Sequence, residues 1–420
     1  MKPKILTTLP GYTRSLFVQD AIAGLTVAMV ALPLSLAIAI ASGTDPAKGL
    51  VTAIVAGFLI SLLGGSRVQI GGPTGAFIVV VFGVIAQHGY DGLVMATFMA
   101  GLILLVAGYF RAGSLIRLVP EPVINGFTIG IAIIIATSQL KDLFGLSPSE
   151  NPAEFIAKVE VLWAARPTFS MAAAVVGLST MMLIVLFRRA APKLPGLIVA
   201  VAITSALVAL ADLPVETIRS RFGDLPNTLP RPAMPVIGFD RIVELLPSAL
   251  IIAFLAGVES LLSAMVADRM ISGRHRPNAE LLAQGAANIG SSLFGGMPAT
   301  GAIARTATNI RAGGKTPVAG LVHAATILLV MLVASRLVGY LAMPALAGLL
   351  ILTAWNMSEP QKWRSYLEER RTDIFLLVLT MVLTVLADLT VAIGVGVALG
   401  LALRLQRRNV PASEWSDPDR

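Results

Sequence analysis

The sequence predicts an all-α protein that crosses a membrane many times, and three observations lead to this fold class. Of its 420 residues, 56% are hydrophobic and only 13% are charged, with a mean hydropathy of +0.82. Soluble proteins carry about 25% charged residues, so this chain has too little polar surface to cover a globule in water. Apolar runs long enough to span a bilayer recur along the chain, and most Lys and Arg residues lie in the loops between them.

The net charge and the residue types present exclude several functional classes. The formal net charge is +8, but aromatic residues make up only 6% of the chain, so we expect no basic and aromatic surface for nucleic acid. The absence of Cys excludes disulfides, thiol catalysis and Cys-based metal sites. The three histidines, His88, His275 and His323, show no metal-ligand spacing. We therefore expect no cofactor, no metal and no enzymatic activity.

About fourteen membrane segments are predicted, seven on each side of a polar stretch. The first seven occupy residues 20–41, 47–64, 75–87, 92–110, 122–140, 169–188 and 196–212. The second seven occupy residues 245–267, 279–294, 301–311, 316–335, 341–355, 373–387 and 389–405. A spanning helix needs about 20 residues, so the third segment of each half is too short to cross the bilayer alone.

The distribution of basic residues predicts the orientation of these segments. If the N-terminus is cytoplasmic, 22 of the 32 Lys and Arg residues fall in cytoplasmic loops and nine fall outside. Basic residues concentrate on the cytoplasmic side of membrane proteins. We therefore expect a multi-pass protein of a bacterial-type inner (plasma) membrane with both termini in the cytoplasm. Arg305 alone belongs to neither group.

The two halves are predicted to form an inverted repeat. A Pro-rich extracellular linker at 213–244 separates residues 1–212 from residues 245–405, and a cytoplasmic tail follows at 406–420. An odd number of spans in each half gives the halves opposite orientations, as in inverted-repeat transporters. Each third segment also opens with a Pro followed by Thr-Gly-Ala, within Gly71–Ala76 and Gly296–Ala302.

These two openings predict a pair of half-helices that meet near the membrane midplane. Gly and Pro ahead of a short helix favour extended backbone, which must line a cavity or pack against protein at that depth. Helix N-termini carry free N–H groups and a partial positive charge, so two of them would bind an anion. Thr74 and Thr300 would add hydroxyl donors. The alternative is that both are kinked packing helices, because Gly and Pro are common in membrane helices.

Two ionisable residues are predicted inside the spans. Arg305 lies about one turn into the second half-helix, where a cation faces a cavity or a partner unless it snorkels to the inner surface. Glu259 lies in segment 8, where burial disfavours its charged form and Arg305 would favour it, so it is suited to carry a proton. The alternative is a structural Glu259–Arg305 ion pair. Ser263, one turn further, shares the face of Glu259.

The residues described above are typical of a known family. Gly72–Gly75, Glu259–Leu262 with Val266–Asp268, and above all Thr300–Asn309 followed by Ala312–Pro317 resemble the sulfate permease (SulP) family of anion transporters. This family is related to the eukaryotic sulfate-anion exchangers and prestin, and the resemblance covers nearly the whole chain.

The resemblance implies a uracil-permease-like fold of seven plus seven segments. It implies a core domain of segments 1–4 and 8–11 that moves as an elevator against a gate domain of segments 5–7 and 12–14, in a homodimer. The implied anion-binding residues are Leu34 and Ile38, then Pro73, Thr74, Gly75, Ala76 and Phe77, and Thr300, Gly301, Ala302, Ile303, Ala304 and Arg305. Glu259, with Ser263 beside it, would couple a proton, because sodium-coupled bicarbonate relatives typically have Asp at the position of Glu259.

The expected function is therefore secondary active, proton-coupled transport of a small anion such as sulfate, bicarbonate or a dicarboxylate. The alternatives are a passive anion channel or an uncoupled exchanger on the same scaffold. A neutral nucleobase carrier of the related permease family is disfavoured by the charge of Arg305. Most family members continue into a cytoplasmic STAS domain, whereas this sequence ends at Arg420, and both a naturally short member and a shortened chain fit that difference.

Overall fold

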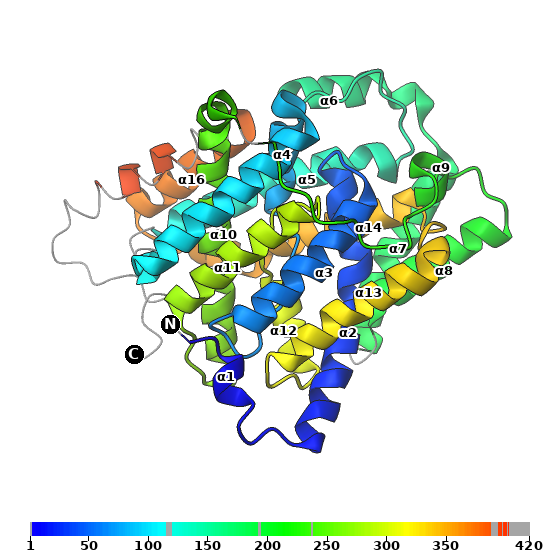
Figure 1. The fold of residues 1–420 in the computed structure, drawn as a ribbon. Coiled ribbons are helices and arrows are strands. Elements are labelled where there is room, and N and C mark those ends of the chain that lie inside the picture. Colours follow the sequence, from blue (N-terminus) through cyan, green and yellow to red (C-terminus); the bar gives the residue numbers. More distant parts are fainter. Residues whose placement is uncertain are drawn as a thin grey trace.

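The computed structural model describes residues 2–114, 120–191, 195–236, 238–387, 394–396, 398–400 and 402, and within them the chain is mostly helical (Figure 1). The first half contains α1 (Ile5–Thr8), α2 (Arg14–Ala41), α3 (Pro46–Leu63), β1 (Gly71–Gly72), α4 (Phe77–Tyr109), α5 (Glu121–Leu143), α6 (Phe155–Ala164), α7 (Met171–Ala190), α8 (Gly196–Leu210) and α9 (Ile218–Phe222). The second half contains α10 (Phe239–Ile271), α11 (Pro277–Leu293), β2 (Thr300–Gly301), α12 (Ile303–Arg311), α13 (Val318–Val338), α14 (Met343–Met357), α15 (Trp363–Glu368) and α16 (Arg371–Leu386).

The predicted class of all-α, multi-pass membrane protein is confirmed. Seven helices in the described part of the chain, α2, α3, α4, α5, α7, α10 and α13, are long and apolar enough to cross a membrane. The helices α8, α11, α12, α14 and α16 also coincide with predicted segments but are shorter. The last predicted segment, 389–405, falls almost wholly outside the described residues, and the tail 406–420 lies outside them entirely.

Several predicted boundaries were wrong. Segments 75–87 and 92–110 form one run, α4, which is interrupted only at Gly89, where φ is 69° and ψ is 179°. Glycine adopts this conformation without steric cost, so the chain bends there without a separate loop. The linker ends earlier than expected, because α10 begins at Phe239. The short amphipathic helices α6 and α9 were not predicted, since neither is long enough to appear as a membrane run.

Local sequence explains where the spanning helices of the first half begin. The side chain of Thr13 accepts a hydrogen bond from the N–H of Leu16 at the start of α2, and Asp45 does the same for Ala47 at the start of α3. Pro46 occupies the first helical position of α3, where no N–H is needed. Ser170 caps α7 in the same way. These caps define where the apolar runs become helical.

The helices pack in two groups. In one, α4 packs against α10 and α11, α13 packs against α2 and α3, and α12 packs against α2 and α10. In the other, α5 packs against α14 and α16, and α7 packs against α8 and α14. Contacts of α2 with α8 and α14 join the groups. The site described below lies within the first group.

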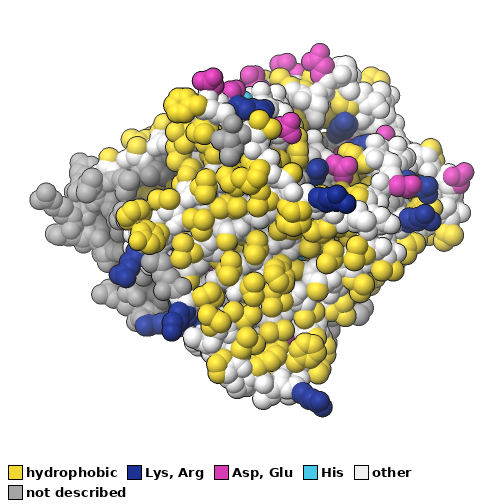
Figure 2. Space-filling model, in the orientation of Figure 1, with side chains coloured by type: hydrophobic (Ala, Val, Ile, Leu, Met, Phe, Trp, Pro, Cys, Tyr) yellow, Lys and Arg dark blue, Asp and Glu magenta, His cyan; other side chains and the backbone are white. Residues whose placement is uncertain are grey.

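The surface has the bands expected of a membrane protein. In Figure 2, hydrophobic side chains cover the broad middle of the molecule, while acidic side chains gather along the upper and right-hand margins. Basic side chains lie among these acidic ones, and basic side chains also lie at the lower left and lower end, where no acidic side chain is visible. Large apolar side chains are more than half exposed on several helices, among them Val106, Met182, Leu210, Val333 and Leu386. Such exposure is stable only where lipid replaces water.

The connection between the halves is fastened to both groups of helices. The N–H groups of Ile218 and Arg219 donate to the carbonyls of Leu341 and Gly339, just before α14. Further along the connection, the N–H of Ala233 donates to the carbonyl of Leu293, the last residue of α11, at 2.7 Å.

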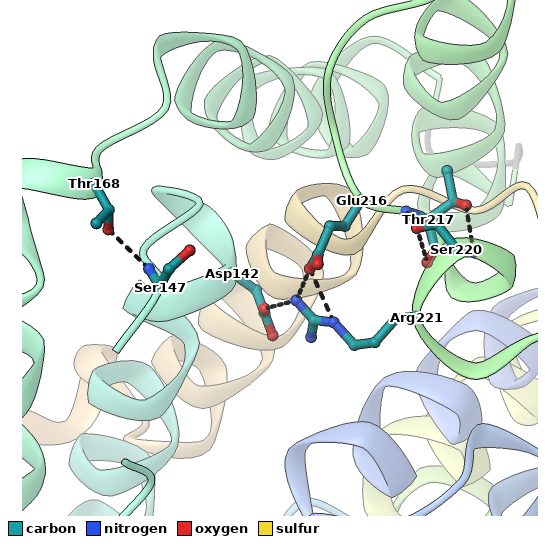
Figure 3. Close-up of polar contacts among 7 residues, drawn as sticks. All are labelled: Asp142, Ser147, Thr168, Glu216, Thr217, Ser220 and Arg221. Carbon is teal, nitrogen blue, oxygen red and sulfur yellow. Dashed lines mark hydrogen bonds and ion pairs between the residues drawn. The ribbon is translucent and has the colours of Figure 1, made fainter. Parts of the chain in front are cut away.

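Side chains of this connection also bind α5. Figure 3 shows the Arg221 guanidinium between Asp142, at the end of α5, and Glu216. Nη2 of Arg221 donates to Oδ1 of Asp142 at 2.6 Å, and Nε donates to Oε2 of Glu216 at 2.9 Å. Thr217 and Ser220, in the same figure, exchange the two hydrogen bonds of a capping box at the start of α9.

Candidate functional site

The two unwound segments lie side by side. β1 and β2 pair as antiparallel strands, with Gly71 opposite Gly301 and Gly72 opposite Thr300. The N–H of Ala302 extends this pairing by donating to the carbonyl of Ile70 at 2.8 Å. The unwound backbone and its side-by-side placement agree with the sequence prediction. Neither Thr74 nor Thr300 lies on a continuous helix.

The two segments are aligned as the repeated Thr-Gly-Ala sequence predicts. Helix α4 begins at Phe77, three residues after Thr74. Helix α12 begins at Ile303, three residues after Thr300. The residue before each helix is an alanine, Ala76 or Ala302. The repeated sequence therefore marks equivalent positions ahead of the two helices.

Side chains of the second half hold the first unwound segment. The N–H of Gly65 donates to Oε2 of Glu280 at 2.8 Å, and the N–H of Ile70 donates to Oγ1 of Thr306 at 3.1 Å. Nδ2 of Asn309 donates to the Val68 carbonyl at 2.8 Å. Buried backbone without secondary structure requires such partners.

The second unwound segment is held mainly by its own half. The Asn288 amide accepts from the N–H of Ala299 and donates to its carbonyl, both at 2.9 Å. The N–H of Met297 donates to Oγ1 of Thr52 on α3 at 2.7 Å, which is the contribution of the first half.

Arg305 is buried between the two segments and α2. Its side chain is 1% exposed, which excludes snorkelling to the surface. Nη2 donates to Oγ of Ser35 at 3.1 Å and to the carbonyl of Pro73 at 3.0 Å. Nε and Nη1 have no partner among the described residues, and no ion pair is formed with Glu259. Gly72 makes room for the guanidinium, because a Cβ there would lie 2.4 Å from Nη1.

Glu259 and Ser263 have different partners. Oε2 of Glu259 accepts a hydrogen bond from Oγ1 of Thr74 at 2.9 Å, so this carboxylate faces the first unwound segment. The Ser263 hydroxyl lies 3.2 Å from Oγ1 of Thr306 on α12. The structure therefore joins Glu259 to Thr74 and leaves Ser263 in the packing between α10 and α12.

The remaining predicted residues fall into two environments. Ile38 and Phe77 are fully buried in the hydrophobic core, and Leu34 packs against that core. Ile303 and Ala304, in the first turn of α12, are exposed, and no side chain caps this helix. The Thr300 hydroxyl is already engaged, because it donates to the carbonyl of Ala256 at 2.8 Å. The backbone between these environments comes from five further predicted residues, which are Pro73, Gly75, Ala76, Gly301 and Ala302.

Sequence reasoning missed a polar stripe on α11. Glu280, Gln284 and Asn288 recur every four residues and are completely buried. Oε1 of Glu280 accepts from Oγ of Ser260 and from Nε2 of Gln284, both at 3.0 Å. A spacing of four places residues on one helix face, so this pattern was visible in the sequence. It was overlooked because the segment was read for apolar length alone.

Comparison with known proteins identifies the family. The sequence profile of the sulfate permease family matches residues 17–380. This chain belongs to the sulfate permease family. It is 44% identical over 381 residues to the putative sulfate transporter YvdB of Bacillus subtilis (strain 168), covering 90% of this chain and 72% of that protein.

Solved structures agree with this family assignment. The transmembrane domain of a cyanobacterium bicarbonate transporter, BicA, is 28% identical, with a TM-score of 0.80 over 93% of this chain and 97% of that domain. The structure of SLC26A9 matches with a TM-score of 0.86 at 18% identity, over 96% of this chain and 68% of that chain, which shows a shared fold. The sulfate permease family consists of transporters, which confirms the prediction that the chain is not an enzyme.

Proposed function

We propose that this sulfate permease family member is a proton-coupled secondary transporter of a small oxyanion, of which sulfate, bicarbonate and dicarboxylates are the candidates. The anion binds where the starts of α4 and α12 meet, near the membrane midplane. The residues involved run from Pro73 to Phe77 and from Thr300 to Arg305, and Leu34 and Ile38 of α2 complete the pocket. The names of YvdB and BicA support sulfate and bicarbonate as the first anions to test.

The unpaired charge of Arg305 carries this proposal. A buried cation without a counter-ion costs several kcal/mol, yet the described residues place no carboxylate within ion-pair distance of this guanidinium. Two of its nitrogens, Nε and Nη1, have unused donors. An oxyanion would neutralise the charge and accept both hydrogen bonds in the paired geometry that guanidinium groups favour.

The first turn of α12 supports the same conclusion. The first N–H groups of a helix have no intrahelical partner and carry partial positive charge. Here no side chain caps them, and Ile303 is 43% exposed, so the surface beside them is accessible. The N–H groups at the start of α12 and the guanidinium of Arg305 thus offer hydrogen-bond donors with positive charge from adjacent positions.

Glu259 is proposed as a proton carrier of the coupled cycle. Its carboxylate lies beside the first unwound segment and is bonded to Thr74. Protonation removes a negative charge close to the anion site, so proton binding and anion binding favour each other. An uncoupled exchanger or a passive channel on the same scaffold would not need this carboxylate to titrate.

The two packing groups are proposed as the moving parts. The first group of helices corresponds to a core domain and the second to a gate domain, with the core moving as an elevator. We also propose a homodimer with both termini in the cytoplasm. Figure 2 supports that orientation, because the charged side chains visible at the lower end are basic, whereas the upper margin carries both signs, and basic residues favour the cytoplasmic side.

Uptake by proteoliposomes tests the proposal. Radiolabelled sulfate, bicarbonate and succinate are supplied with and without an inward proton gradient. We expect accumulation of one anion that the gradient accelerates, loss of uptake in Arg305→Gln, and loss of the acceleration in Glu259→Gln. Arg311→Gln is the matched control for charge, since Arg311 is exposed at the far end of α12. Glu244→Gln is the control for a carboxylate on α10.

Three outcomes contradict parts of this assignment. Normal uptake by Arg305→Gln would exclude the anion site. Unchanged acceleration in Glu259→Gln would exclude the proton role of that residue. Anion currents far above a transporter's turnover, insensitive to Glu259, would favour the channel.

A further inference from the structure

A buried histidine lies on α13, close to the proposed anion site. His323, on α13, is completely buried, and neither ring nitrogen has a hydrogen-bond partner among the described residues. The other two histidines each have a carboxylate partner. His88 pairs with Glu244 at 2.9 Å, and His275 pairs with Asp268 at 2.7 Å. Buried polar groups almost always have partners, so His323 indicates a place where water or another small species binds.

The same face of α3 borders His323 and Arg305. A Cβ on Gly57 would lie 4.0 Å from Cδ2 of His323 and 3.1 Å from the carbonyl of Gly71. One turn earlier on α3, the Cα of Ala53 lies 3.6 Å from the position of a Cβ on Gly72, which would touch Nη1 of Arg305. Residues four apart lie on one side of a helix. The imidazole and the guanidinium are therefore neighbours along α3, beside the first unwound segment.

A third polar group without a hydrogen-bond partner among the described residues lies one turn further along α3. Ser61, one turn beyond Gly57, has a buried hydroxyl without a partner among the described residues. Its oxygen would lie 2.0 Å from a Cβ on Gly320, in the turn of α13 before His323. Unused donors of Arg305, both nitrogens of His323 and this hydroxyl thus follow one another along α3. A short row of internal water molecules would satisfy all of them.

Charged groups lie on several of the helices around the ring. α13 packs against α2 and α3 (Figure 1). Their charged groups include Asp20, which binds the N–H groups at residues 315 and 316 near the start of α13, and Lys48, which lies over the ring of Tyr90. Arg14, the first residue of α2, and Arg311 also lie on neighbouring helices, and Arg305 reaches the same face of α3 as the His323 ring.

This arrangement links protonation to anion binding. A proton on His323 next to an unpaired Arg305 would place two positive charges together in a medium of low dielectric constant. An anion on Arg305 cancels that repulsion. Binding of one species must then favour binding of the other to the same extent.

We propose that His323 is a second proton-binding residue, which takes up a proton from internal water when an oxyanion binds to Arg305 and releases it when the anion leaves. The proton adds to the free lone pair of the neutral imidazole, so an N–H bond forms as an O–H bond of a hydronium ion in the internal water breaks, which leaves a neutral water molecule; release of the proton reverses both changes. The inference rests on the proposed anion site at Arg305. It adds a second proton-binding residue, carried on α13 rather than on α10.

Ring protonation can be observed directly. The chain has three histidines, so the double substitution His88→Gln, His275→Gln leaves His323 as the single imidazole. With ¹⁵N-labelled histidine in lipid nanodiscs, we expect neutral ring signals at pH 7 without anion and imidazolium signals with saturating sulfate or bicarbonate. Adding Arg305→Gln should abolish this change. A ring that stays neutral while the anion is bound, or is charged in both conditions, overturns the proposal.

Binding measurements separate this inference from the proposed function. We expect acidification from pH 8 to pH 6 to tighten anion binding by about 10-fold in the Glu259→Gln background. The response should be lost when His323→Gln is added but kept with His88→Gln. His323→Asn should repeat the result of His323→Gln, which guards against a folding defect of either variant. If His323→Gln binds the anion with the same pH response, this inference is wrong and the proposed function stands. If the unsubstituted protein binds none of the anions, the proposed function itself fails.

Discussion

The unwound segment before α4 and the one before α12 share a backbone arrangement but differ in their chemistry. Each leaves the helical path for a few residues, and the two pair through glycine-rich strands. The second half, however, provides Arg305, Glu259 and most side chains that fix the first segment, such as Glu280. The first half provides mainly backbone, in particular the carbonyl of Pro73 and the space above Gly72.

This difference shows how an inverted repeat acquires one-sided chemistry. Symmetry brings two helix starts together, which creates a region of positive potential with no particular charged residue. A cation that comes from one half alone then makes the two sides of that region chemically different. The predictions below test whether the first segment serves the site through its backbone and the second through its side chains.

The largest effect is expected from a methyl group at Gly72. Its φ is 149°, a conformation that other residues rarely adopt, and the new Cβ would lie 2.4 Å from Nη1 of Arg305. Gly72→Ala should therefore displace the guanidinium and reduce anion uptake about 100-fold, since strain of about 1–3 kcal/mol corresponds to changes of this size. Proteoliposome uptake and the anion Kd measure it. Gly83→Ala is the control, because Gly83 has open space around it.

A methyl group at Gly301, in the second segment, should act differently. A Cβ on Gly301 would lie 1.5 Å from Nε2 of Gln69, whose amide donates to Ser260. Gly301→Ala should mainly lower stability. Equal loss of anion affinity in Gly72→Ala and Gly301→Ala, with equal stability, would refute the distinction between the segments.

An intermediate effect is expected from the side chains that hold the second segment. Asn288→Leu removes three hydrogen bonds, of which two are to Ala299, and leaves both backbone groups of Ala299 unpaired. Thr52→Val leaves only the N–H of Met297 unpaired. An unsatisfied buried group costs about 1–3 kcal/mol. The free energy of unfolding in mixed micelles should therefore fall about twice as far for Asn288→Leu. A larger loss of unfolding free energy in Thr52→Val would show that the hydrogen bond from the first half stabilises the segment more.

The smallest effect is expected from the two threonines. Thr74→Val removes the donor to Glu259, so the pH dependence of uptake should change about 3-fold in KM with little loss of stability. Thr300→Val removes a bond to the Ala256 carbonyl and should cost about 1 kcal/mol of stability without affecting pH dependence. Thermal unfolding and uptake between pH 5.5 and 8 distinguish the two. Identical behaviour of the pair would mean that the hydroxyl of Thr74 has no part in coupling.

The general architecture followed from the sequence because its signals are local. Apolar length identified the helices, and Gly and Pro identified the interruptions near Gly72 and Gly301. The merging of two segments into α4 escaped detection, since a few polar residues around Gly89 resemble a loop although the helix continues beyond them. α6 escaped because ten residues are too few to stand out as a membrane run.

The site could be predicted only in part. A lone Arg305 among apolar residues is conspicuous in any sequence, and so is Glu259. Their partners, Pro73 and Thr74, depend on which turn of one segment lies beside which turn of another. That choice is made by backbone pairing, which is nearly independent of residue type where glycine dominates.

The connection between the halves also restricts how the protein can change shape. Three backbone hydrogen bonds, including those from Ile218 and Arg219, fasten it before α14, whereas a single described one, from Ala233 to Leu293, fastens it to α11. If either group of helices slid past the other by one helical turn, about 5.4 Å, hydrogen bonds of 2.7–2.9 Å could not stretch to follow. The hydrogen bond from Ala233 to Leu293 is the weaker of the two attachments, so it would break first. The rest of the connection would then move with α14.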